Sequence, residues 1–303
     1  MGADISSAGG MIAHVERSWT KKPTSATKLA GLFISYIGQD LEEAKASCSG
    51  CPFLPGSTEN LTARAAAKAR GETHPICHSH GGQVAVGFKA SMKKHGGKRP
   101  ALSLADVVGL IPRHVKAVRD AIIGDPAGAC RESTLADDRT AERHGLSVIR
   151  YTHFAEGKGE WLKGRAMASC LGLEDAMRLA EAGWSVFAAV EWDWFKEGGY
   201  SKRLPNGMTA VMCPNTASKW QGRRPVTCGD CGGKKGPLCT GKRTDGKGRP
   251  LIILNPDHGP GVSSRLFAAA SRPGGDWALP GLNASRKSAA LKLRAKRMGV
   301  TND

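Results

Sequence analysis

Apolar segments of strand length alternate along this chain with segments of helical pattern. Strand character is found in residues 31–37, 145–154, 184–192, 208–212 and 250–255. Helical patterns cover residues 60–70, 103–124 with a break near Pro112, and 173–183. Strands that are joined through helices by short links pair in parallel, because each connection must cross over the sheet. We therefore expect an α/β fold with a partly parallel sheet, and a partial barrel is one form that such a sheet takes.

Four cysteines lie close together in a segment with little capacity to form a core. They are Cys213, Cys228, Cys231 and Cys239, and the residues between them are rich in glycine, lysine and arginine. A C-x-x-C turn, here from Cys228 to Cys231, brings two thiolates within reach of one ion. A bound metal would supply the order that the segment itself lacks. The spacing predicts a cysteine-rich metal module that holds zinc, with a [4Fe–4S] cluster as the alternative.

A second cysteine cluster lies nearer the N-terminus. Cys48 and Cys51 form another C-x-x-C pair, and Cys77 is followed by His80. Together the four side chains would make a Cys₃His metal site, and the three cysteines alone could hold an iron–sulfur cluster.

The positive charge is concentrated in the last third of the chain. Residues 201–303 contain 19 Lys and Arg against 5 Asp and no Glu, so they carry +14 of the total net charge of +17. Such a surface favours a nucleic-acid partner, either DNA or RNA. Trp220 lies among arginines and could stack on an unpaired base. The candidate nucleic-acid-binding residues are Trp220, Arg223, Arg224, Lys234, Lys235, Arg286, Lys287, Lys292, Arg294, Lys296 and Arg297.

Residues 103–118 resemble a helix-turn-helix motif. Ala105 and Gly109 would lie at the close helix crossing and the turn, because two helices that pack at a steep angle need small residues there. Arg113, His114, Lys116 and Arg119 would then face DNA. An ordinary pair of amphipathic helices is the alternative interpretation of the same pattern.

Polar side chains also follow the carboxyl ends of several expected strands. Parallel α/β folds place their chemistry at that edge of the sheet, where carboxylates and imidazoles can act as acid and base or hold a hard metal ion. The candidate catalytic residues are His153, Glu191, Asp193, Asp257 and His258.

The chain is expected to divide into four parts. These are a loose N-terminal segment over 1–29, an α/β body over 30–212, the cysteine module with its closing strand over 213–259, and a basic tail over 260–303. No apolar run approaches the ~18 residues that cross a bilayer, and the N-terminus lacks the pattern of a secretory signal. Nine cysteines, an odd number, in a chain of this length favour metal binding over disulfides. We therefore expect no membrane partner and a cytoplasmic location.

Several segments, in order between residues 48 and 259, resemble a family of phage and plasmid proteins. They are CSGCPF with CHSHGG, then IGDPA, RYTHF, AGWSVFAAVE and CPNTASKWQGRRPVTCGDCGG, followed by a closing strand and His258-Gly259. The family is labelled "rolling circle replication initiator protein and truncated derivative". The resemblance implies a role in DNA replication of a mobile element, in the cytoplasm of the host cell. The chain departs from the His-hydrophobic-His motif of rolling-circle nickases, because its one His-x-His, at His78 and His80, has a polar centre.

These patterns together favour a metal-containing nucleic-acid-binding protein of a phage or plasmid, with a role in replication. Two other classes stay open. The first is an enzyme, either a metal-dependent nuclease or nickase or an iron–sulfur enzyme on a partial barrel. The second is a protein that binds and inhibits a host factor.

Overall fold

The structure is a computed structural model, and it describes about two thirds of the chain. The described residues are 11–13, 32–38, 40–51, 54, 56–69, 88–90, 92–93, 95–97, 101–190, 200–220 and 226–256. The basic tail, expected over 260–303, lies outside them.

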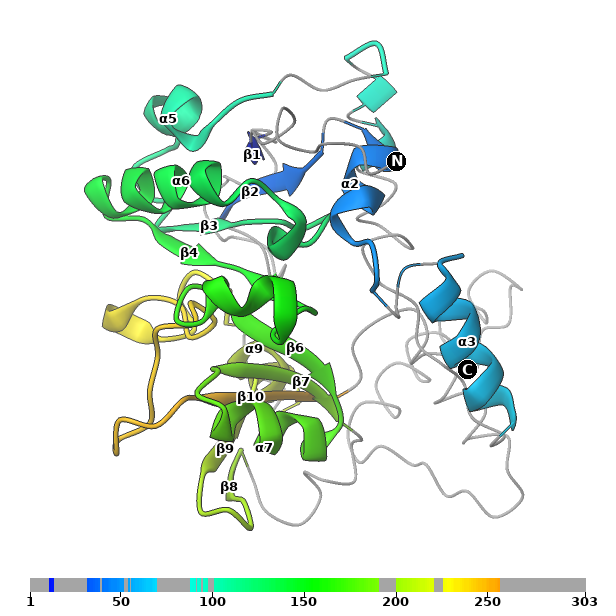
Figure 1. The fold of residues 1–303 in the computed structure, drawn as a ribbon. Helices are drawn as coiled ribbons and strands as arrows, with labels where there is room; N and C mark the ends of the chain where they lie inside the picture. Colours follow the sequence, from blue (N-terminus) through cyan, green and yellow to red (C-terminus); the bar gives the residue numbers. More distant parts are fainter. Residues whose placement is uncertain are drawn as a thin grey trace, which may run out of the picture.

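The strands form one group of four and one group of six (Figure 1). The first group runs in the order β1 (Met11–Ala13), β2 (Leu32–Ile37), β3 (Ala117–Arg119) and β4 (Ser147–Ile149). The second runs in the order β5 (Tyr151–Thr152), β6 (Met167–Leu171), β7 (Val186–Val190), β10 (Ile252–Pro256), β9 (Thr209–Met212) and β8 (Ser201–Arg203). Only the edge strands β1 and β8 pair antiparallel. The expectation of an α/β fold with a partly parallel sheet is therefore confirmed.

The two groups of strands meet at Arg150. This residue alone separates β4 from β5, so the two strands follow each other along the same line of chain. The backbone N–H of Asp120 donates to the carbonyl of Ile149, and the N–H of Met167 donates to the carbonyl of Arg150. Residues 147–152 thus bond to β3 on one side and to β6 on the other, which makes the sheet continuous.

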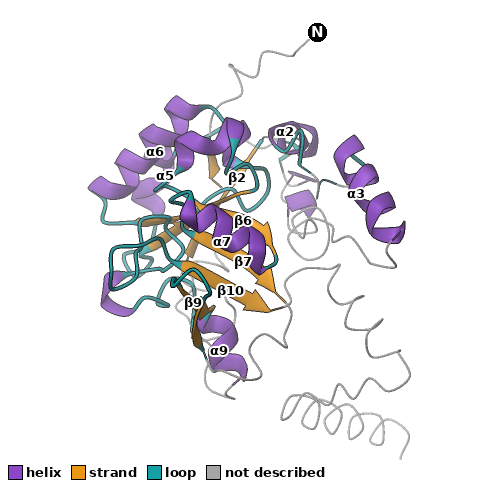
Figure 2. Cartoon of the chain, turned by 60° about the horizontal axis from the view of Figure 1, so that its bottom comes forward, coloured by secondary structure: helices purple, strands orange, loops and turns teal. Residues whose placement is uncertain are grey.

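The helices α6 (Arg131–Arg143) and α7 (Leu173–Glu181) cover one face of this sheet, which we name the helix face. The helical segments are α2 (Leu41–Ser47), α3 (Thr58–Ala69), α5 (Leu104–Val107), η2 (Val108–Leu110), η3 (Pro126–Gly128), α6 (Arg131–Arg143), η4 (Gly157–Leu162), α7 (Leu173–Glu181), α9 (Pro214–Trp220) and η5 (Gly233–Lys235). The apolar residues of α7 pack on Ala168, Val186 and Ala188, and Figure 2 shows α7 lying over β6 and β7. Further along the same face, Ala141 of α6 packs with Phe33 and Val118.

The opposite side of the sheet, which we name the cysteine face, has a separate core. Side chains alternate along each strand, so Ile253 of β10 faces this side while Ile252 and Leu254 face α7. Ile253 packs here in one cluster with Met167, Cys213 and Cys239. The strand that closes the cysteine segment is therefore a central strand, and it places part of that segment against the sheet.

The helix-turn-helix interpretation of residues 103–118 is wrong. The first helix is short and ends in a single 3-10 turn before Pro112, and the expected second helix is replaced by β3. Val115, Ala117 and Val118 are all buried, as suits a strand between two others and not a helix with one exposed side. The broader expectation of helix over 103–124 fails for the same reason.

Candidate functional site

The cysteine face brings together three of the four cysteines of the 213–239 segment. Cys213 follows β9 directly, and its backbone N–H donates to the carbonyl of Leu254 at 2.8 Å. Cys213 and Cys239 are buried in the core of this face, and Cys228 packs against the same cluster. The fold therefore collects cysteines that are up to 26 positions apart in sequence on one surface of the sheet.

Cys231 lies in a tight turn with Cys228. The hydroxyl of Thr227 donates to the Asp230 carboxylate at 2.7 Å, and the backbone N–H of Leu238 donates to the Cys231 sulfur at 3.2 Å. Backbone donors aimed at cysteine sulfur stabilise the thiolate form, which is the form that binds metal. Gly232 is required here, because a Cβ at this position would lie 1.8 Å from the carbonyl oxygen of Gly236.

The thiols act on one another electrostatically. Burial raises the pKa of Cys239, and the thiols of Cys231, Cys228 and Cys213 raise it further, while the Tyr151 hydroxyl opposes them. Thiols that are crowded in this way resist ionisation unless a cation compensates the charge of their thiolates. Within the described part of the chain, however, no three His, Cys, Asp or Glu side chains stand close enough together to hold a metal ion as they are placed.

The segment that carries the cysteines is anchored at the amino ends of the strands. The hydroxyl of Ser185, just before β7, lies within hydrogen-bonding distance of the carbonyls of Gly241 and Arg243, at 3.3 and 3.1 Å. Gly241 has a φ of +74°, and a Cβ there would lie 2.6 Å from the backbone of Ala166. These contacts fix the chain beyond Cys239 against the sheet.

The outer side of the same segment is basic. Residues 226–250 contain six Lys and Arg against two Asp. Lys234 and Lys235 lie on η5 and are exposed, as are Lys242 and Lys247. The other candidate nucleic-acid-binding residues lie outside the described part of the chain, and so does the side chain of Trp220. They are Arg223, Arg224 and the tail residues Arg286, Lys287, Lys292, Arg294, Lys296 and Arg297.

Of the candidate catalytic residues, His153 is the one that the structure describes. It follows β5 at the carboxyl edge of the sheet, and its Nδ1 lies 3.2 Å from the carbonyl oxygen of Ser169. Its backbone N–H donates to the buried carboxylate of Asp125 at 2.8 Å. Glu191, Asp193, Asp257 and His258 lie outside the described residues.

Asp125 and His153 influence each other's protonation. Burial raises the pKa of Asp125, although His153, two backbone N–H groups and the Thr152 hydroxyl oppose this rise. Protein atoms packed around the imidazole lower the pKa of His153, against the attraction of Asp125, while part of the side chain stays exposed. A neutral imidazole at a sheet edge can accept a proton from a bound group.

The N-terminal cysteine pair lies at the end of α2. Cys48 and Cys51 are buried, and the backbone N–H of Cys51 donates to the carbonyl of Cys48 at 2.9 Å. Lys158 donates to the carbonyl of Ser49 at 2.8 Å, which holds the turn against the body. Cys77 and His80 lie outside the described residues, so the Cys₃His assignment stays a prediction.

Sequence patterns did not single out Arg150 or Asn255, and they assigned Arg119 to a DNA-facing helix where the structure has β3. Arg150 is fully buried on the helix face between Asp120 and Asp138, and Asn255 is fully buried at the end of β10. Arg119 stacks on the ring of Tyr151, with its Cζ 3.9 Å from the ring centroid. Each of these residues lies inside or at the end of a strand. A polar residue within an otherwise apolar strand pattern is the one feature of the sequence that could have identified them.

Comparisons with protein-family models, with curated proteins and with solved structures give no match for this chain. None of the helices in the described residues has the length and apolar character needed to cross a membrane.

Proposed function

We propose that this protein binds nucleic acid through a basic surface built on a metal-holding cysteine module. Cys213, Cys228, Cys231 and Cys239 would be the ligands, and zinc is the metal that suits four thiolates in a glycine-rich knuckle, with [4Fe–4S] as the alternative. The resemblance to phage and plasmid proteins assigns this activity to the replication of a mobile element.

The observation that supports this proposal is that three of the four cysteines, Cys213, Cys228 and Cys239, lie in one cluster on the cysteine face, in a segment that also carries exposed lysines. Burial and mutual repulsion raise the pKa of Cys239 in the absence of a cation, and a metal ion would reverse that effect. Loading would draw the thiols of the turn and of β9 together. It would thereby fix Lys234 and Lys235, which lie between Cys231 and Cys239, as a rigid cationic surface.

The experiment that tests this proposal compares two cysteine variants of the full chain, purified without oxygen. We expect Cys228→Ser to lose about one metal equivalent, to become protease-sensitive between residues 213 and 239, and to bind a fluorescent oligonucleotide more weakly. Cys130→Ser is the matched control, because Cys130 caps α6 on the other side of the sheet, where its thiol contacts Glu132. Equal metal content in the two variants would refute the ligand assignment. A colourless protein with zinc, or a brown one with iron, identifies the metal.

One observation favours an enzyme as the second candidate. His153 lies at the carboxyl edge of a parallel sheet, beside a buried carboxylate, with its Nδ1 directed at a backbone carbonyl. If Nδ1 carries the proton, Nε2 is the basic nitrogen and could serve a nuclease as general base. Cleavage of an oligonucleotide that is lost in His153→Gln and retained in Cys228→Ser would favour this candidate.

A further inference from the structure

Arg119 points to the cysteine face of the sheet. Its two neighbours in the chain face the other way, because Val118 packs in the core of the helix face and Asp120 accepts a hydrogen bond from Ser35 there. The guanidinium of Arg119 lies over the ring of Tyr151, which holds it flat. A side chain held in this way is already ordered before any ligand arrives.

Arg119 carries one buried donor that lacks an acceptor. Its Nη1 is buried and makes no hydrogen bond, and no carboxylate in the described part of the chain forms an ion pair with it. A buried N–H of a charged group without a partner costs more free energy than a neutral one. Such a group in a folded protein therefore calls for an explanation, and a bound anion is the simplest acceptor.

Asn255 is a second donor without a partner on the same face. It is fully buried near the carboxyl end of β10, and the hydroxyl of Thr216 lies 2.5 Å from its Oδ1. That contact fixes the orientation of the amide, and the Nδ2 group is left without a hydrogen bond. Ile253, two residues earlier in β10, faces the cysteine face, so the alternation of the strand places Asn255 there as well.

An aromatic pair lies beside Arg119 on this face of the sheet. The rings of Tyr151 and Phe187 meet edge to face with their centroids 5.0 Å apart. Phe187 of β7 pairs in register with Ile253 of β10. Arg119 on β3 and Asn255 on β10 thus lie on the same face, with Tyr151 and Phe187 on strands between them, near the carboxyl ends of parallel strands, where α/β sheets bind their ligands.

We propose that Arg119 binds the phosphate group of a nucleotide at this face of the sheet, with Asn255 as a donor to another part of the same ligand. Both unsatisfied groups are donors, so the ligand must be rich in acceptors, and the planar fork of a guanidinium matches two phosphate oxygens. The inference deepens the proposed function, on which it rests, by giving the nucleic acid one defined phosphate contact in addition to a diffuse basic surface.

The test measures binding of adenosine 5′-monophosphate, inorganic phosphate and adenosine to the full chain by calorimetry. We expect the two phosphates to bind and adenosine alone to bind at least tenfold more weakly. Arg119→Lys keeps the charge but loses the fork, and should weaken binding of the monophosphate by about tenfold or more. Asn255→Asp should weaken it further by repulsion. Arg139→Lys is the matched control, because Arg139 is exposed on α6 at the opposite face.

Two results would overturn the inference. The first is equal affinity of wild type and Arg119→Lys for the monophosphate, or no binding by wild type. The second is loss of metal from Arg119→Lys with unchanged monophosphate affinity, which would make Arg119 a countercharge for the thiolates. Asn255→Asp buries an additional carboxylate and can unfold the chain, so Arg119→Lys, checked by circular dichroism, decides the test. Salt-sensitive oligonucleotide binding without any effect of Arg119 would leave the proposed function standing and remove only this site.

Discussion

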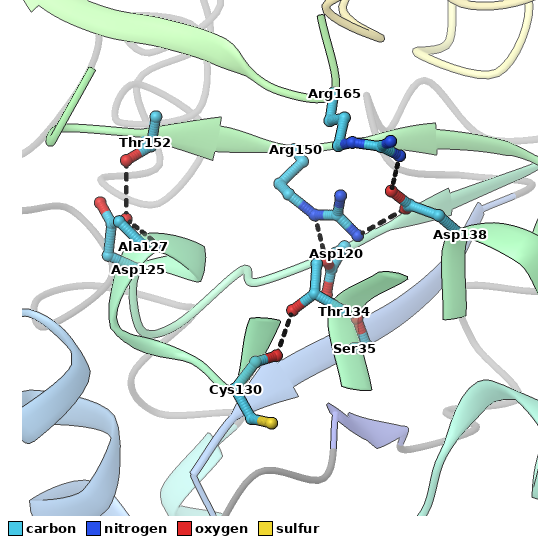
Figure 3. Close-up of polar contacts among 10 residues, drawn as sticks. All are labelled: Ser35, Asp120, Asp125, Ala127, Cys130, Thr134, Asp138, Arg150, Thr152 and Arg165. Carbon is cyan, nitrogen blue, oxygen red and sulfur yellow. Dashed lines mark hydrogen bonds and ion pairs between the residues drawn. The ribbon is translucent and has the colours of Figure 1, made fainter. Parts of the chain in front are cut away.

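Arg150 is a fully buried arginine that forms ion pairs with two carboxylates. Its Nε lies 2.5 Å from the carboxylate of Asp120, and its Nη2 lies 3.0 Å from that of Asp138, which also pairs with Arg165 at 3.1 Å (Figure 3). Asp120 accepts a further hydrogen bond from Ser35 at 2.7 Å. Four elements, β2, β3, α6 and the β4–β5 junction, are thus joined through one guanidinium. Removal of one partner from such a buried set leaves an uncompensated charge.

Asp137, beside this network, makes the stability of the fold depend on pH. Burial raises its pKa to about 7, and the like charges of Asp120 and Asp138 add to the rise, against Arg150 and the backbone N–H of Leu104. The folded state therefore keeps a proton that the unfolded chain releases near pH 4. The stabilisation from this proton is complete below about pH 4 and is lost as the pH rises toward 7.

We expect Asp137→Asn to stabilise the protein at pH 8 by roughly 2 kcal/mol relative to wild type, and to change its stability little at pH 4. The amide keeps the acceptor for Leu104 and removes the charge. Urea unfolding at both pH values measures the difference. Glu142→Gln, at an exposed position of the same helix, is the control and should show no such pH dependence. An Asp137→Asn effect of the same size at pH 4 and pH 8 would contradict the assignment.

At the scale of elements, the sequence identifies strands with apolar character better than it identifies helices with a polar interior. The strands β2, β7, β9 and β10 were all expected near their observed positions, because each is a continuous apolar run. The helix α6 was not expected, since its buried positions are Thr134, Asp137, Thr140 and Ala141, which form no apolar stripe. On the buried side of α6, polar contacts with the Arg150 network replace apolar packing. The partners in these contacts are distant in the sequence and come together only in the folded chain.

The cysteine segment contacts the amino ends of the strands at Gly241. This contact predicts how a substitution of that glycine changes the stability of the fold. Gly241→Ala would place a Cβ 2.6 Å from the backbone of Ala166, and we expect it to lower the free energy of unfolding by about 2 kcal/mol or more. Gly248→Ala is the matched control, because Gly248 has a nearly equal φ of +76° with open space around its Cβ position. The Gly248→Ala variant therefore has the same backbone strain as Gly241→Ala but no steric clash of its Cβ. Thermal unfolding of the two variants separates these effects, and equal losses would show that the segment is not held against Ala166.

At the scale of the whole molecule, charge and cysteine spacing are properties that a sequence shows directly. The positions of the cysteines predicted a common site, and the fold gathers three of them into one core cluster. The spacing could not predict Tyr151, Arg119 or Asn255 beside that cluster, because these residues come from separate strands whose register decides which face each one meets. The basic character of the segment was equally visible in the sequence, whereas its position at the outer side of the cysteine face needed the structure.

That position leads to a prediction for the salt dependence of nucleic-acid binding. Each phosphate that a lysine neutralises releases condensed counterions, so affinity falls steeply with salt. Neutralisation of Lys234 and Lys235 together should weaken binding of an oligonucleotide and reduce the salt slope by roughly 1.4 to 1.8, at 0.7 to 0.9 for each lost contact.

Arg139 and Arg143 carry the same charge on the exposed side of α6, so their replacement by glutamine lowers the net charge equally. If the basic surface is local to the cysteine segment, the α6 variant keeps the wild-type slope. If only net charge matters, both double variants lose affinity to the same extent, and the segment has no special role. Titration of a fluorescent oligonucleotide with salt distinguishes these outcomes, because the slope counts phosphate contacts independently of the absolute affinity.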